Sequence, residues 1–213
     1  MSERVERARI LYERAVFDGD PGALTEADRV LDAVEADLAL ARGRVAHGRF
    51  MAGGPEDPRE RTLFERAAEL YRVLGDVRGE GEALFWTAMY HQVVRRDDGA
   101  AVPLLERSLV LATEAGDELT MSYALRHLGI AAHSAGRLDT ARAHLEESSR
   151  LRRGFGFLPG VAANLVGLAY IASAGDRPAD AAALLDEAAG LATDAKAAGV
   201  MRSIDEARAH LGG

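Results

Sequence analysis

Histidine and acidic side chains are the residues of this chain that could bind a metal ion or transfer protons, and their spacing argues against both roles. The sequence has six histidines and no cysteine. His127 and His133 are six residues apart, which places them about 120° apart around a helix, and no HExxH pattern accompanies them. Adjacent acids such as Glu146 and Glu147 point apart on a helix. We therefore expect no metal, no cofactor and no catalytic triad.

A glycine-rich segment and a basic cluster follow each other near residue 155. Residues 154–160 (GFGFLPG) lack the Lys-Ser/Thr of a phosphate-binding loop and follow an expected helix rather than a strand, so we interpret them as a turn. The cluster at 150–153 lies near a helix C-terminus, where cations complement the helix dipole. A net charge of −8 opposes binding to nucleic acid and to anionic membranes, and we expect neither as a partner.

The composition favours helices over strands. Hydrophobic residues make up 48% of the chain and aromatic residues only 6%, while alanine and leucine are abundant and β-branched runs are nearly absent. The first residues are charged, and no stretch of about 18 uncharged apolar residues occurs. We therefore expect a cytoplasmic protein.

One four-residue phrase returns along the chain at steps of 41, 40 and 40 residues. Each copy has a large apolar residue, two charged residues and a small residue, and a fixed period of this kind is typical of a repeated structural unit. Glycine and aspartate mark two classes of turn within each period, which predicts two helices per repeat. The copies are Phe64-Glu65-Arg66-Ala67, Leu105-Glu106-Arg107-Ser108, Leu145-Glu146-Glu147-Ser148 and Leu185-Asp186-Glu187-Ala188.

These signals predict an all-α fold of about five antiparallel helix pairs and a closing helix, in a single domain over residues 1–213. A break near residues 35–37 would separate two helices, and the alternative is one long helix over 22–51. The expected helices are 3–17, one from the turn at 19–22 to about 35, then 37–52, 59–74, 79–95, 99–115, 118–135, 138–153, 159–174, 178–192 and 196–211.

Residues 125–148 resemble the tetratricopeptide repeat family. Gly129 and Ala141 stand where that family needs small residues for close helix packing, and Leu128 and Leu145 stand where large residues fill the seam. The period near 40 instead of 34 is similar to the long-repeat variety in kinesin light chains and in bacterial transcription activators. The resemblance covers residues 37–195; residues 1–36 match it poorly, and 196–213 are expected to form a capping helix. The matching positions are Leu125, Leu128, Gly129, Ala132, Gly136, Ala141, Leu145 and Ser148.

The resemblance implies a right-handed α-solenoid whose concave face is formed by the first helix of each pair and holds the ligand. Aromatic, cationic and hydrogen-bonding groups would line this face, with Arg126 as the anchor for an anion. The implied ligand-binding residues are Phe85, Met89, Tyr123, Arg126, Ile130, His133, Asn164 and Leu168.

Two functions fit such a face. The first is an adaptor or regulatory scaffold that binds a partner protein or peptide without catalysis. The alternative is a sensor of a small organic ligand, or a cofactor-free acid/base enzyme using His133, Arg126 and Tyr123. A homodimer is a further option, through an apolar stripe on the last helix that more often caps the final repeat. The stripe comprises Ala198, Met201, Ile204, Ala207 and Leu211.

Overall fold

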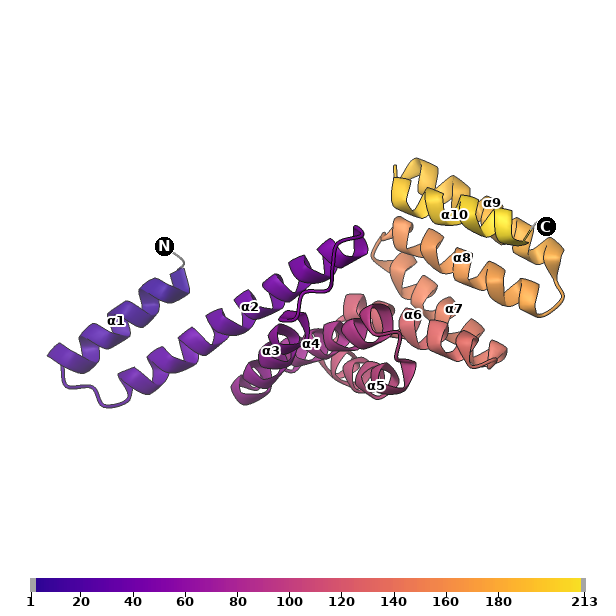
Figure 1. Ribbon diagram of the computed structural model, residues 1–213. Helices are drawn as coiled ribbons and strands as arrows, with labels where there is room; N and C mark the ends of the chain where they lie inside the picture. The colour runs from indigo at the N-terminus through magenta and orange to yellow at the C-terminus, as the bar shows by residue number, and fades with distance from the viewer. Residues whose placement is uncertain (1–2, 212–213) are drawn as a thin grey trace. The chain divides into compact units, whose positions relative to one another are not determined.

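The computed structural model describes residues 3–211, and within that range the chain forms ten α-helices, one π-helical turn and no strand (Figure 1). The all-α prediction is confirmed. The elements are α1 (Glu3–Phe17), α2 (Ala23–Met51), α3 (Glu60–Leu74), α4 (Val77–Met89), η1 (Tyr90–Val94), α5 (Asp98–Ala115), α6 (Glu118–Ser134), α7 (Leu138–Gly154), α8 (Leu158–Ala174), α9 (Pro178–Asp194) and α10 (Ala198–Leu211).

The chain divides into two compact units, Met1–Ala115 with α1 to α5 and Gly116–Gly213 with α6 to α10. Within each unit every helix packs against the next one in the sequence, and α10 also packs against α8. The expected closing helix over 196–213 corresponds to α10, and its last two positions lie outside the described residues. The assignment of the whole chain to one domain stays a prediction.

The predicted break near residues 35–37 is wrong, because α2 runs without interruption from Ala23 to Met51. The alternative of one long helix over 22–51 is confirmed to within one residue. The first half of α2 packs on α1 and the second half packs on α3. The helix stays continuous at the point where its packing partner changes from α1 to α3. Ala36 lies at this change and is fully buried. At Gly43 an added Cβ would lie 2.4 Å from the ring of Phe64, so only glycine allows this close approach.

The predicted glycine and aspartate turns are confirmed. Gly75 ends α3 with a φ of 73°, and Asp76 then caps α4 by accepting a hydrogen bond from the backbone N–H of Gly79 at 2.9 Å. Asp117 caps α6 in the same way by accepting from the N–H of Thr120 at 3.2 Å. These caps satisfy N–H groups that the first turn of a helix leaves free.

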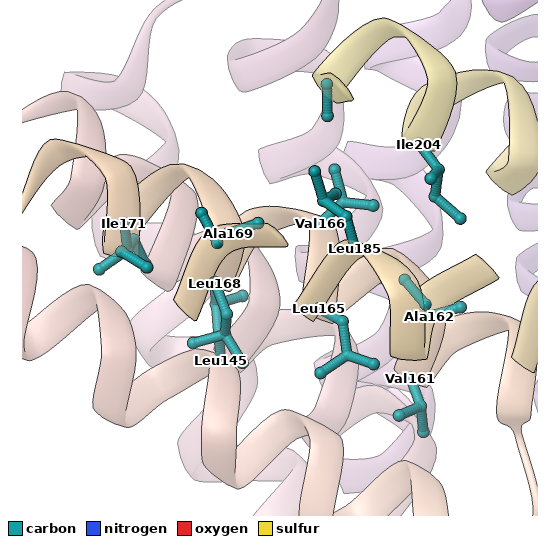
Figure 2. Close-up of a cluster of buried hydrophobic side chains, with 14 of the residues drawn as sticks. Leu145, Val161, Ala162, Leu165, Val166, Leu168, Ala169, Ile171, Leu185 and Ile204 are labelled. Atoms are coloured by element: carbon teal, nitrogen blue, oxygen red, sulfur yellow. The ribbon is translucent and has the colours of Figure 1, made fainter. Parts of the chain in front are cut away.

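The core of the second unit lies between α6, α7, α8, α9 and α10, and Figure 2 shows Leu145, Leu165, Leu185 and Ile204 converging there. Leu145 fits against two glycines, since a Cβ on Gly129 would lie 3.0 Å from its Cγ and a Cβ on Gly167 2.8 Å from its Cδ1. The close packing predicted at Gly129 is thus confirmed. The stripe on α10 faces this core, with Ile204 and Ala207 fully buried.

Candidate functional site

Two arginines of the second unit meet at one asparagine. Arg126 of α6 is partly buried, and Arg152 of α7 is 1% exposed. Their Nη1 atoms donate to Oδ1 of Asn164 of α8 at 3.0 and 3.1 Å. Nη1 of Arg126 also donates to the carbonyl of Ala163, and Nη1 of Arg152 to that of Gly160, both at 2.8 Å. Three helices therefore converge on a shared polar site, which we call the arginine cluster: Arg126, Arg152 and Asn164.

Serines of α7 hold Asn164 in place. Ser148, Ser149 and Arg152 continue the buried face of α7, at spacings of three, four and seven residues from Leu145. Nδ2 of Asn164 donates to Oγ of Ser148 at 2.8 Å and to Oγ of Ser149 at 3.2 Å. Because both ends of the amide make two hydrogen bonds, its orientation is fixed.

Aromatic rings cover the guanidinium of Arg152. Its Cζ lies 5.0 Å from the ring centre of Tyr123 and 5.6 Å from that of Phe157, within the range of cation–π attraction. Gly160 makes room for this stacking, because an added Cβ would lie 2.5 Å from Phe157 and 2.9 Å from Cδ of Arg152. The side chain of Arg152 is thus held by packing as well as by hydrogen bonds.

The arginine cluster has no acidic side chain to balance its charge. Within residues 3–211 neither Arg126 nor Arg152 forms an ion pair with an aspartate or glutamate. Burial lowers the pKa of the Arg126 guanidinium. Burial and the nearby positive charge of Arg126 together lower the pKa of Arg152 to about 10, while the electrostatic effect of Tyr123 acts to raise it. Nη2 of Arg152 is buried and has no hydrogen-bond partner in the described part of the chain. The cluster therefore combines two cationic side chains with one buried donor that has no partner among the residues described.

Three of the eight predicted ligand-binding residues, Tyr123, Arg126 and Asn164, lie at this cluster. Ile130 and His133 are partly exposed further along α6. Phe85 and Met89 of α4 are each 3% exposed, and Leu168 of α8 is 9% exposed. The ligand-binding role of all eight stays a prediction.

Leu168 also borders a shallow depression of about 350 Å³ over α7, α8 and α9. Acidic and basic side chains alternate around it, and Arg177 there already pairs with Asp180 at 3.2 Å. Its lining has two arginines and three acids, so its charges nearly cancel and slightly disfavour an anion. It is a weaker candidate site than the arginine cluster.

The sequence pattern did not predict the role of Arg152, which we grouped with its basic neighbours. Arg150 and Arg153 are exposed and pair with Glu147 at 2.6 Å and with Glu187 at 2.9 Å. Arg152 differs because it lies seven residues after Leu145, on the buried face of α7. That helical phase was the signal that could have separated it from the surface arginines.

The first unit buries a polar pair of another kind. Nδ1 of His47 on α2 lies 2.8 Å from Oε1 of Glu60, the first residue of α3, and the two side chains are 10% and 0% exposed. The imidazole meets the edge of Trp86 with ring centres 5.6 Å apart. Sequence reasoning gave His47 no role. The pair joins α2 to α3 across the intervening loop.

No group of three or more histidine, aspartate and glutamate side chains within residues 3–211 is arranged to hold a metal ion. None of the helices described is long and apolar enough to cross a membrane. No family model matches the chain, and no curated protein matches it. The resemblance to the tetratricopeptide repeat family therefore stays a prediction.

Proposed function

We propose that this protein is a non-catalytic binding scaffold, built as a right-handed solenoid of tetratricopeptide-like helix pairs, which holds an acidic group of a partner protein or peptide at the arginine cluster. One observation carries the proposal: two guanidiniums lie together in a poorly solvated site without an acid from residues 3–211, and Nη2 of the buried one has no partner. An uncompensated buried charge is costly, and an entering carboxylate would offset that cost.

The geometry suits an anion better than a neutral group. A carboxylate oxygen at Nη2 of Arg152 would form a charge-assisted hydrogen bond in a medium of low polarity, where such bonds are strong. It would also return the pKa of Arg152 toward its ordinary value, because the added negative charge favours the protonated guanidinium. The fixed amide of Asn164 lowers the ordering cost of binding.

Apolar side chains near the cluster favour a peptide as the partner. Phe155, in the turn after α7, and Leu158, the first residue of α8, are 39% and 38% exposed, and Tyr123 is partly exposed. They would contact apolar residues beside the acidic group. The net charge of −8 repels extended polyanions, so recognition would depend on one acidic group rather than on a charged surface.

A second candidate function is the sensing of a small organic anion. Arg152 is 1% exposed, and a buried group is reached more easily by a compact ligand than by a chain. A hydrolytic enzyme is less well supported. The hydroxyls of Ser122, Ser148 and Ser149 all donate to backbone carbonyls at 2.6 to 2.9 Å, so none of them is activated by a base.

Fluorescence polarisation with a library of labelled peptides ending in a free carboxylate tests the proposal. We expect Arg126→Gln and Arg152→Gln to weaken binding at least about tenfold, since each removes a charged hydrogen bond worth more than 1.4 kcal/mol. Arg150→Gln is the matched control, because that arginine is exposed on the same helix. Unchanged affinity in Arg152→Gln would contradict the proposal. Binding of a small dicarboxylate, measured by isothermal titration calorimetry, together with no binding of any peptide would favour the sensor instead.

A further inference from the structure

Four large apolar residues lie on the exposed side of α2 at intervals of seven. Leu24, Leu31, Leu38 and Val45 are 51%, 44%, 47% and 54% exposed. A spacing of seven residues is nearly two helical turns, so these side chains form one stripe, roughly 32 Å long. The buried residues of α2 face α1 and α3 instead. The stripe is thus separate from the core of the first unit.

A row of charged residues runs beside the apolar stripe. Asp28, Glu35, Arg42 and Arg49 each follow a member of the stripe by four residues and are exposed. Their order along the helix is acid, acid, base, base. The whole helix shares this polarity, because residues 23–37 contain five acids and one arginine whereas 38–51 contain three arginines and no acid.

We propose that this face of α2 binds the same face of a second copy of the chain, with the two helices antiparallel. In that arrangement Asp28 lies opposite Arg49 of the other copy, and Glu35 lies opposite Arg42. Both pairs have the same midpoint on α2, between Leu38 and Ala39, so one two-fold axis satisfies four charge contacts. About this axis Leu31 lies beside Val45 of the other copy and Leu38 beside its own counterpart, whereas Leu24 lies beyond the end of the other α2. A parallel pair would place acids beside acids and arginines beside arginines, which is repulsive.

The charged row is largely free to form these contacts. Asp28, Arg42 and Arg49 form no ion pair within 4.0 Å among residues 3–211. Arg49 nevertheless lies near Asp57, whose pKa is lowered first by hydrogen bonds from Arg59 and further by the charge of Arg49. Glu35 accepts a hydrogen bond from Nε of Arg66 at 2.7 Å, yet its side chain stays 50% exposed. Since the surface lies on the first unit and the arginine cluster on the second, the dimer does not depend on the proposed function.

Sedimentation velocity of the full chain over a range of concentrations tests the dimer. We expect the wild type to dimerise. The double variant Leu31→Glu/Leu38→Glu should raise the dissociation constant at least about 100-fold, because each copy then places two carboxylates in the apolar contact. Val110→Glu is the matched control, since Val110 of α5 is 56% exposed on another helix. A monomeric wild type would overturn the proposal, as would a double variant that dimerises normally or a control that does not dimerise.

Cysteine cross-linking tests the orientation, and the natural sequence has no cysteine to interfere. Asp28→Cys and Arg49→Cys lie roughly 32 Å apart along α2. In an antiparallel pair they form a disulfide when the two variants are mixed, and neither forms one alone. A disulfide in either single variant would contradict this arrangement, and so would a mixture that fails to cross-link while circular dichroism shows folded helices.

Discussion

The two units of the chain each bury a polar cluster, and the clusters differ in whether an acidic side chain takes part. In the first unit His47 faces the carboxylate of Glu60 at 2.8 Å. In the second unit Arg126 and Arg152 share Asn164, and no acid of residues 3–211 pairs with either guanidinium. A histidine and an acid on two helices tend to fix the helices together, although Oε2 of Glu60 has no hydrogen-bond partner within residues 3–211. A cluster of like charges has capacity for a ligand of opposite charge.

Removal of one polar partner should therefore lower the free energy of unfolding more in the first unit than in the second. His47→Ala leaves Glu60 fully buried without its partner, and we expect a loss of about 3–5 kcal/mol in the free energy of unfolding. Urea denaturation measures the change. His47→Gln, which keeps a donor, should lose less. A loss below about 1 kcal/mol in His47→Ala would show that the pair does not stabilise α2 against α3.

Packing around the arginine cluster gives a smaller expected effect. Gly160→Ala places a methyl group 2.5 Å from Phe157, so we expect a loss of about 1–3 kcal/mol from overpacking. Gly154→Ala is the control, since nothing lies within 4 Å of an added Cβ there. Thermal denaturation of both variants makes the comparison. Equal melting temperatures would mean that Arg152 and Phe157 are less tightly packed than the structure indicates.

Removal of the buried charge should have the smallest effect on stability. Arg152→Met removes the hydrogen bonds that Arg152 donates to Gly160, Asn164 and Ser122, but it also removes the cost of an uncompensated buried cation. The flexible thioether can pack under Tyr123. We expect the free energy of unfolding to change by less than about 1 kcal/mol while binding of acidic peptides is lost. Urea denaturation that showed a loss above about 3 kcal/mol would assign Arg152 a structural role like that of His47.

Features that depend on short stretches of sequence could be predicted. The turn at Gly75 and Asp76 follows from the conformations that these two residues favour, and the close contact at Gly129 follows from the lack of a side chain. The continuity of α2 could not be predicted from a short stretch of sequence. It depends on packing against α1 and α3, and the segment around Ala36 contains neither a glycine nor a proline to decide the question locally.

The two polar clusters also depend on tertiary packing, which local sequence does not reveal. His47 and Glu60 lie on different helices with a loop between them, so only the tertiary fold brings the histidine to the carboxylate. Arg126 and Asn164 were predicted from the family resemblance. Arg152 was hidden among neighbouring arginines that ion-pair at the surface. Distinguishing it required knowing which face of α7 is buried.

Arginine side-chain NMR tests the central claim most directly. In ¹⁵N-labelled protein titrated with acetate, phosphate and the best carboxylate-terminated peptide, the Nε–Hε signals of Arg126 and Arg152 should shift and saturate together with at least one of these probes. Those of Arg150 and Arg153 should stay unchanged, because these residues are exposed and already paired. If the signal of Arg152 stays fixed with all three probes, the arginine cluster is not an anion-binding site.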